Sequence, residues 1–187
     1  RSAIKAYRKN LSAHAEYQLE SAVGFSDILS ISPLFGLGAS GNELNQVIED
    51  LFLQVQEKLV ICTPYFNFPR TLRSKLARLL EQGKCVEIIV GDKVANDFYI
   101  PPEQPFKMAG ALPYLYESNL RRFCEKFDAY IKNGHLTVRL WKDGDNTYHL
   151  KGVWVDNQYI LLTGNNLNPR AWRLDAENGL LIHDPKQ

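Results

Sequence analysis

Two short apolar runs, separated by one stretch of helix-forming residues, constrain the fold of this chain more than any other feature. Residues 58–66 have the sequence KLVICTPYF and residues 86–90 have the sequence VEIIV, and both are typical of buried strands. Residues 70–82, between them, predict a helix that Gly83 terminates. Because a strand, a helix and a strand in this order are typical of two parallel strands joined by a crossover helix, we expect an α/β fold.

The other segments predict a mixed α/β domain in which helices flank a mostly parallel sheet and a hairpin lies near the C-terminus. We divide the chain into an N-terminal helical or linker segment, residues 1–26, and one lobe, residues 27–187. Asn42 is a helix-capping residue followed by apolar side chains at helical spacing. We therefore expect helices over residues 3–20, 42–55 and 112–132, a loop over 93–110, and strands over 27–34, 136–141, 148–155, 158–163 and 179–182.

Composition and charge restrict the class of protein. The chain has 187 residues, of which 45% are hydrophobic and 23% are charged, as in one globular domain with a substantial core. Its 22 Lys and Arg residues nearly balance its 21 Asp and Glu residues, which argues against duplex DNA or RNA as the main partner. No apolar run reaches the roughly 18 residues that span a bilayer. Because the first residue is Arg1, we expect the chain to be part of a longer protein.

The cysteines predict neither a metal site nor a disulfide. Cys62, Cys85 and Cys124 lie far apart in the sequence and form no CxxC pair. We expect each to be a small buried side chain in a reducing compartment. We expect no bound metal or cofactor.

The residues most informative about chemistry are His149 and Lys151. Successive side chains of a strand point to opposite faces, so these two residues share a face with Val153 and Val155. An imidazole and an ammonium group about 7 Å apart along a strand can reach the same phosphate group. A His and a Lys on an edge strand are also a common surface pair, and both interpretations remain open on spacing alone.

The connection after this strand predicts which residues face His149. A two-residue hairpin loop at residues 156 and 157 places Lys151 opposite Leu162. His149 then faces Gly164, where the polar sequence GNNLN begins. Amide groups and bare backbone at this place would form a cradle for phosphoryl oxygens, supplied by Gly164, Asn165, Asn166 and Asn168.

Two acidic residues have different predicted roles. Asp156 lies seven residues after His149, about 23 Å along a straight strand, and is too far away to orient the imidazole. We expect Asp156 to form the turn by bonding its own backbone. Glu177, just before the last strand, either returns a carboxylate to His149 or is an ordinary surface residue.

The pattern formed by His149, Lys151 and Asp156 is similar to the HxKxxxxD signature of the phospholipase D superfamily. The longer words TYHLKG, LLTGNNLNPRAW and ENGLLIHDP resemble more specifically the bacterial CDP-diacylglycerol–serine O-phosphatidyltransferases, the type II phosphatidylserine synthases. The resemblance extends over about residues 27–185 and implies a phospholipase D-like lobe, the second of two repeats. It implies phosphatidyl transfer from CDP-diacylglycerol to L-serine, with release of CMP, by a cytoplasmic enzyme associated peripherally with the inner membrane.

The resemblance also implies roles for individual residues. In the superfamily two such motifs face each other: one histidine attacks phosphorus to give a phosphohistidine, the other protonates the leaving group, and no metal is needed. For His149 we favour the role of general acid and base. Asn166 stands where many members have Ser, so its contact is an amide instead of a hydroxyl. The remaining implied roles are phosphate contacts by Lys151, Asn165, Asn166 and Asn168, and orientation of the histidine by Glu177.

The chain contains only one HxK motif, so the second histidine must come from elsewhere. His14, His135 and His183 lack a lysine two residues later, and we expect them to be structural or surface residues. The missing motif comes from an N-terminal repeat or from a second copy of the chain. Two further functions stay open: hydrolysis of a lipid or nucleic-acid phosphodiester, and a non-enzymatic lobe that only binds a partner.

Residues 98–116 form a segment rich in aromatic and apolar side chains. It is either a loop that packs on the core of its own domain, or a groove for acyl chains and shallow contact with an anionic membrane surface. Arg121, Arg122 and Lys126 either add attraction to lipid headgroups or form a solvated helix face.

Overall fold

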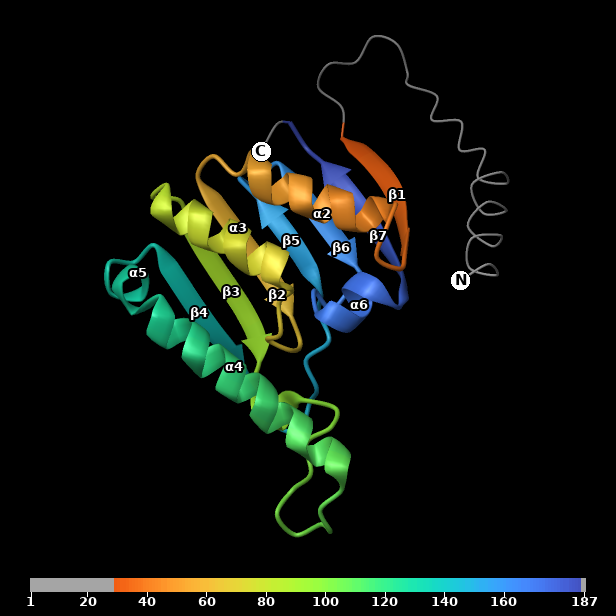
Figure 1. Cartoon of the computed structure of the whole chain (residues 1–187), viewed down its shortest axis with the longest axis vertical. Coiled ribbons are helices and arrows are strands. Elements are labelled where there is room, and N and C mark those ends of the chain that lie inside the picture. Colours follow the sequence, from red (N-terminus) through yellow and green to blue (C-terminus); the bar gives the residue numbers. More distant parts are fainter. Residues whose placement is uncertain (1–28, 186–187) are drawn as a thin grey trace.

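The computed structural model describes residues 29–185, which form a seven-stranded sheet with helices packed against it (Figure 1). The strand order across the sheet is β1-β7-β6-β5-β2-β3-β4. The strands are β1 (Ser30–Leu37), β2 (Lys58–Thr63), β3 (Cys85–Gly91), β4 (Leu136–Trp141), β5 (Gly152–Val155), β6 (Tyr159–Thr163) and β7 (Ala176–His183). The helices are α2 (Glu43–Gln54), α3 (Arg70–Glu81), α4 (Leu112–Lys126), α5 (Asp128–Lys132) and α6 (Pro169–Arg173), with short 3-10 helices η1 (Lys93–Ala95) and η2 (Met108–Ala111).

The sheet is mixed, as predicted. Strands β2, β3 and β4 are parallel, with α3 connecting β2 to β3 and with α4 and α5 between β3 and β4, so the predicted crossover unit is confirmed. The other neighbours, β1–β7, β7–β6, β6–β5 and β5–β2, are antiparallel. The prediction of a mostly parallel sheet is therefore wrong. The tight turn between β5 and β6 can join only antiparallel strands, which accounts for one of these four pairings.

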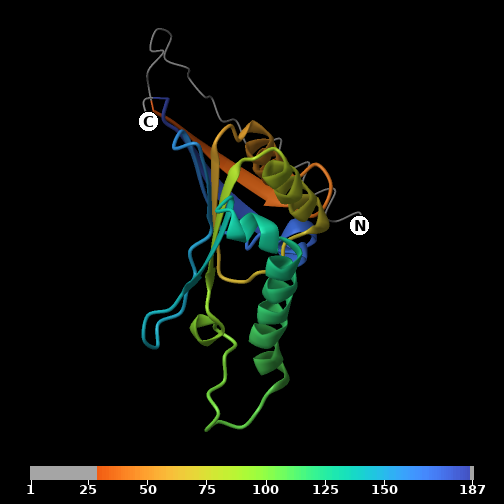
Figure 2. The ribbon, with the colours of Figure 1, turned by 90° about the vertical axis from the view of Figure 1, so that its left-hand side faces the viewer.

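The core lies between the sheet and the helices, which Figure 2 shows on one side of the sheet seen nearly edge-on. Asn42 caps the start of helix α2, and its side chain accepts a hydrogen bond from the amide of Asn45 at 3.0 Å, as the capping prediction requires. Burial of each large apolar side chain contributes about 1.5–3 kcal/mol to holding the two layers together. Completely buried side chains come from both layers: Leu44, Ile48, Leu72 and Leu76 from helices, and Leu59, Ile61 and Ile88 from strands.

The connection between β5 and β6 is one residue longer than predicted. Val155 pairs with Tyr159 and not with Gln158. Residues 156 and 157 both have positive φ, 50° and 59°, a region that Asp and Asn adopt more readily than most residues. The amide of Gln158 closes this turn on the carbonyl of Val155 at 3.0 Å, and Gln158 then remains outside the strand pairing.

This shift changes the predicted surroundings of the HxK motif. Lys151 lies opposite Thr163, whose amide donates to the carbonyl of Lys151 at 3.2 Å, and not opposite Leu162. Strand β5 begins only at Gly152, so His149 and Lys151 belong to the segment that leads into the strand.

Other boundaries also differ from the prediction. The predicted helix over 112–132 is interrupted at Phe127, whose ring packs on Phe123 with 4.8 Å between centroids. The cysteines are unpaired as predicted, but of the three only Cys62 is buried: Cys124 is half-buried, and Cys85 is exposed because it opens β3 at the end of the sheet. The predicted helix over 3–20 and the N-terminal segment 1–26 lie outside the described residues. None of the helices within residues 29–185 is long and apolar enough to cross a bilayer.

Candidate active site

A cluster of polar side chains lies at the edge of the sheet where β2 and β3 end and β5 begins. Lys151 places its Nζ 3.0 Å from Nδ1 of His149 and 2.9 Å from the carbonyl oxygen of the same residue. The side chain of His149 is 53% exposed, so one side of the ring is open to a ligand. The structure thus brings the predicted imidazole and ammonium group together, although neither residue lies within a strand.

Asp97 and Tyr65 contact the other nitrogen of the ring. Oδ2 of Asp97 lies 2.5 Å from Nε2 of His149, and the hydroxyl of Tyr65 donates to the same oxygen at 2.6 Å. Because the ammonium group of Lys151 donates to Nδ1, the proton of the neutral imidazole is on Nε2 and is donated to Asp97. The ring is held in one tautomer and one orientation.

The charges of this cluster are shifted by burial and by their neighbours. Burial tends to raise the pKa of Asp97, but hydrogen bonds from Tyr65 and His149 outweigh it and the pKa lies below its ordinary value. Burial is the largest cause that lowers the pKa of Lys151, against the charges of Glu177 and Asp97. The ammonium form of Lys151 is therefore lost at a lower pH than that of an exposed lysine.

Tyr65 forms one wall of the cluster. Its ring stacks on Tyr116 with 5.3 Å between centroids and meets the imidazole of His149 edge-on at 6.3 Å. Burial, followed by the hydrogen bond to Asp97, raises the pKa of Tyr65 well above its usual range. Tyr65 is therefore a permanent hydrogen-bond donor at neutral pH.

The predicted asparagines of the GNNLN loop have different surroundings. Asn165 is completely buried, its Oδ1 accepts from the amide of Leu167 at 2.8 Å, and its Nδ2 donates to Asn45 at 3.3 Å. Its amide group shapes the loop, which argues against the predicted phosphate contact by Asn165. Oδ1 of Asn166 is buried and lacks a hydrogen-bond partner within the described part of the chain.

Asn168 caps helix α6. Its Oδ1 accepts hydrogen bonds from the amides of Arg170 at 3.0 Å and Ala171 at 2.9 Å. The backbone of the loop is tied to β2, because the hydroxyl of Thr63 donates to the carbonyl of Asn166 at 2.8 Å. The end of β2 and the GNNLN loop are therefore held at the same edge as the His149 cluster.

Glu177 acts on Lys151 and not on His149. The carboxylate that is bonded to the imidazole is Asp97, so the predicted orienting role of Glu177 is not seen. Burial is the largest cause that raises the pKa of Glu177, and the charge of Lys151 opposes it. A Cβ atom at Gly164 would lie 2.8 Å from Oε2 of Glu177, so the glycine allows this carboxylate to approach.

Asp156 lies at the other end of β5 and has structural contacts. Its carboxylate accepts hydrogen bonds from the backbone amides of Gln56 at 2.6 Å, Glu57 at 2.9 Å and Lys58 at 2.7 Å. The prediction that it lies far from His149 agrees with this placement. The prediction that it bonds its own backbone is wrong, because the turn lies beside the residues that lead into β2.

The other described histidines lie apart from the cluster. The ring of His183 stacks on Tyr159 with 4.4 Å between centroids. His135 precedes β4, and its Nδ1 is buried without a hydrogen-bond partner among residues 29–185. His14 lies outside the described residues. No group of three His, Cys, Asp or Glu residues that could hold a metal ion occurs in that same part of the chain.

Sequence reasoning missed Asp97 and Tyr65, although a signal for both was present. Tyr65 follows β2 closely and Asp97 follows β3, and the carboxyl ends of neighbouring parallel strands lie at one edge of a sheet. Polar residues just after two parallel strands are therefore expected to meet. The aromatic composition of the surrounding loop concealed this signal.

Comparison with known proteins gives matches over nearly all of the chain. The family model described as cardiolipin synthase, PLD-like domain, matches residues 48–187. The CDP-diacylglycerol–serine O-phosphatidyltransferase of Haemophilus influenzae is 81% identical over 187 residues, which are 100% of this chain and 41% of that protein. The enzyme of the same name from Escherichia coli K12 is 57% identical over 183 residues, 98% of this chain and 40% of that protein. The chain therefore spans about two-fifths of the length of these curated relatives.

Solved structures agree with the fold. The crystal structure of phosphatidylserine synthase from Haemophilus influenzae matches with a TM-score of 0.91 and 81% identity, covering 100% of this chain and 42% of that one. The phospholipase D family member Nuc from Salmonella typhimurium matches with a TM-score of 0.52 at 16% identity, covering 85% and 86% of the two chains. The resemblance deduced from the HxKxxxxD pattern and the longer words is thus confirmed, and so is the predicted lobe fold.

Proposed function

The chain belongs to the family of phospholipase D-like domains, and we propose that it is one catalytic lobe of a phosphatidyltransferase. The proposed reaction moves the phosphatidyl group of CDP-diacylglycerol to the hydroxyl of L-serine and releases CMP. High identity to two enzymes that carry this name supports the choice of donor and acceptor.

The observation that carries the proposal is the position of His149 between Lys151 and Asp97 at an open edge of the sheet. One ring nitrogen lies 3.0 Å from an ammonium nitrogen and the other lies 2.5 Å from a carboxylate oxygen. Such an imidazole has a defined tautomer, and the carboxylate stabilises it when it takes up a second proton. Proton transfer next to a bound phosphate requires these properties.

We assign to His149 the role of general acid and base. In the first step a histidine of a second lobe attacks the phosphorus of the phosphatidyl group, and the bond from this phosphorus to the bridging oxygen of the diphosphate breaks. His149 enters this step doubly protonated and gives one proton to the departing CMP oxygen, which leaves the ring neutral. In the second step His149 takes the proton of the serine hydroxyl, whose oxygen attacks the phosphorus and releases the histidine. Each group then has its starting protonation state.

The neighbours of His149 have supporting roles in this proposal. Lys151 attracts a phosphoryl oxygen with its ammonium group, and Glu177 balances the charge of this ammonium before substrate enters. Asn166 and Asn168 hold further phosphoryl oxygens through their side-chain Nδ2 groups, because Oδ1 of Asn168 is already used in capping α6. Asp97 positions the ring of His149 and does not contact the reacting atoms.

The second histidine comes, in this proposal, from a preceding repeat of a longer protein. The two curated relatives are more than twice as long as the part that the chain matches, which leaves room for another lobe. A second copy of this chain remains the alternative source. Counting HxK motifs in the longer protein distinguishes the two sources.

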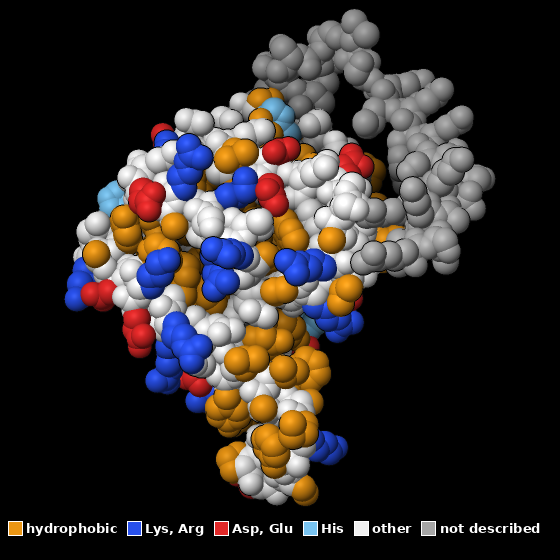
Figure 3. Space-filling view, viewed as in Figure 1, with side chains coloured by type: hydrophobic (Ala, Val, Ile, Leu, Met, Phe, Trp, Pro, Cys, Tyr) orange, Lys and Arg blue, Asp and Glu red, His pale blue; other side chains and the backbone are white. Residues whose placement is uncertain are grey.

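A membrane surface is the proposed place of the reaction. Figure 3 shows apolar side chains gathered at the end of the molecule that residues 98–116 form. Phe106 is 68% exposed and Met108 is 84% exposed, which disfavours packing on the core of the same domain. The ring of Phe98 lies 6.4 Å from that of Tyr65, so this apolar end adjoins the site. We propose that it contacts the inner membrane peripherally and admits the lipid donor.

The test uses the intact protein that contains this chain. Labelled CDP-diacylglycerol is supplied with and without L-serine, and we expect labelled phosphatidylserine and CMP only when serine is present. His149→Asn should lower turnover by about 10²–10⁴-fold, the range that proton transfer contributes. His183→Asn is the matched control, because this ring stacks on Tyr159 away from the cluster.

Two outcomes contradict the proposal in different ways. Phosphatidic acid formed at the same rate with and without serine would identify a hydrolase with the same site. Equal turnover of the His149→Asn and His183→Asn variants would remove His149 from the chemistry.

A further inference from the structure

A groove of about 780 Å³ lies between α3, α4 and the segment that joins β2 to α3, apart from the His149 cluster. Its floor is made of aromatic rings that are each less than one-tenth exposed, those of Phe66, Phe68, Phe123 and Phe127. The rings of Phe66 and Phe123 are 4.8 Å apart, so α4 packs directly on the segment that leads into α3. Neither His149 nor Lys151 nor Asp97 lines this groove.

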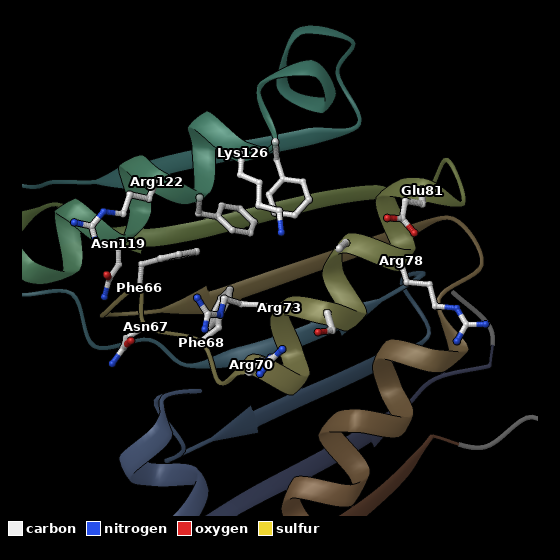
Figure 4. A pocket seen from close by; sticks show the side chains of 14 residues that line it. Phe66, Asn67, Phe68, Arg70, Arg73, Arg78, Glu81, Asn119, Arg122 and Lys126 are labelled. Atoms are coloured by element: carbon white, nitrogen blue, oxygen red, sulfur yellow. The ribbon is translucent and has the colours of Figure 1, made fainter.

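The walls of the groove are strongly cationic. Arg70 and Arg73 come from the first turns of α3, and Arg122 and Lys126 come from the facing side of α4. Figure 4 shows Arg73 and Lys126 extending from opposite helices toward the space above the phenylalanines. Arg78 also lines the groove, but its side chain points away from α4 in this view.

Four of these cations have no acidic partner in the described part of the chain. Within residues 29–185, no Asp or Glu lies within 4.0 Å of Arg70, Arg73, Arg122 or Lys126. Glu81 is the one carboxylate among the described residues that lines the groove, and no ion pair joins it to these four cations. Surface cations elsewhere on the same helices are paired, for example Lys75 with Glu49 and Arg121 with Glu117.

Leaving these charges unpaired has a physical consequence. Arg122 and Lys126 are four residues apart on one helix, where like charges destabilise the helix. The cations of α3 face them across a groove with an aromatic floor, which screens charge less well than open water. An anion in the groove relieves this repulsion. Guanidinium groups suit phosphate in particular, because two N–H groups can bond two phosphoryl oxygens at once.

We infer that the groove between α3 and α4 is a second binding site for a phosphate-bearing anion, separate from the His149 cluster. The bound group is either a free phosphate compound or the headgroup of an anionic lipid, because both present the same oxygens to the arginines. The site does not depend on the proposed transfer reaction. Phe66 of the groove floor follows Tyr65 of the His149 cluster directly, so one short backbone segment connects the two sites.

The test measures binding in the intact protein carrying His149→Asn, so that turnover does not interfere. Arg73→Gln combined with Arg122→Gln removes one cation from each wall. Arg173→Gln combined with Lys142→Gln removes the same charge from exposed positions outside the groove and is the control. Inorganic diphosphate is titrated by calorimetry, and vesicles of phosphatidylcholine with and without phosphatidylglycerol are used for sedimentation.

We expect the groove variant to bind at least one probe about tenfold or more weakly than the control variant, with the difference shrinking at high salt. A loss with diphosphate identifies a free phosphate compound as ligand, and a loss confined to phosphatidylglycerol vesicles identifies a lipid headgroup. Equal behaviour of the two variants with both probes, including an absence of binding, overturns the inference. The serine-dependent turnover assay judges the proposed reaction independently, because it is carried out without the His149→Asn change.

Discussion

The carboxylate of Asp156 offers the most direct quantitative test of how this lobe is held together. It accepts hydrogen bonds from three consecutive backbone amides, those of Gln56, Glu57 and Lys58, at 2.6–2.9 Å. These amides lead into β2, and Asp156 follows β5, so one side chain joins the ends of two neighbouring strands. We expect Asp156→Gly to loosen this end of β5 and to affect the His149 cluster only through this strand, because Asp156 takes no direct part in the chemistry.

The magnitude follows from the number of bonds. Each hydrogen bond to a partly exposed charged acceptor contributes about 1 kcal/mol net, so the loss of this set costs about 3 kcal/mol. Glycine tolerates the φ of 50° at this position, so backbone strain adds nothing. Hydrogen exchange of peptides from β5 and β6, measured by mass spectrometry in the intact protein, should become about 100-fold faster.

Two variants isolate the carboxylate. Asn157→Gly changes the adjacent residue of the same turn, at a φ of 59°, and should alter exchange by less than about threefold. Asp156→Asn keeps one acceptor oxygen and should fall between the wild type and Asp156→Gly. Unchanged exchange in Asp156→Gly, together with lost turnover, would refute this reasoning and make Asp156 a participant in the reaction.

Three further predictions concern the site and its surroundings. Asp97→Asn should lower kcat and change KM little, and it should lower the free energy of unfolding by about 1 kcal/mol at pH 7. The pKa of Asp97 is lowered in the folded state, so the stability that its carboxylate contributes is lost as the pH falls below the ordinary value of 3.8. Urea unfolding at decreasing pH should therefore show the difference between the wild type and the variant vanish. The affinity for CDP-diacylglycerol should fall with rising pH before the ordinary lysine value of 10.5 is reached, because the pKa of Lys151 is lowered, and Lys151→Arg should extend binding to higher pH. Phe106→Ser combined with Met108→Ser should reduce turnover on vesicles about tenfold and leave turnover on detergent-dispersed substrate within about twofold.

Controls for these predictions come from exposed residues elsewhere. Asp145→Asn removes an exposed loop carboxylate, and should leave both the stability and kcat unchanged. Leu53→Ser combined with Leu174→Ser removes comparable exposed apolar surface, because these side chains are 59% and 74% exposed. If this pair reduced vesicle turnover as much as the change at Phe106 and Met108, the apolar end would have no special part in membrane contact.

The parts of the fold that the sequence predicted well depend on short-range patterns. The crossover unit over residues 58–90 and the cap at Asn42 are each encoded within a few neighbouring residues, and both are present. The register of the hairpin was also predicted from a short-range pattern, but this predicted register was wrong by one residue. Its register depends on whether Gln158 enters the strand pairing, and residues 156 and 157 permit either outcome.

The contacts that define the site could not be predicted in the same way, because they join distant residues. Asp97 and His149 are 52 positions apart, and their contact depends on where β3 ends relative to the start of β5. The sequence could not decide between the two alternatives for Glu177 for the same reason. Lys151 is different, since two positions separate it from His149 and local backbone geometry is sufficient.

The HxKxxxxD pattern in this chain extends from one end of β5 to the other, and this gives the spacing of its residues a physical meaning. Lys151 lies at the entrance of β5, and Asp156 lies just past its end. Between them, Gly152 pairs with Cys62 and Val155 pairs with Leu59, so β5 runs antiparallel to β2 over its whole length. The hydrogen bonds of Asp156 to the beginning of β2 fix the register of β5 against β2. The ammonium group of Lys151, at the other end of β5, therefore has a fixed position at the edge of the sheet. The carboxylate of the motif therefore acts on the proposed phosphate site only through the length of one strand, because it lies at the opposite end of β5 from Lys151.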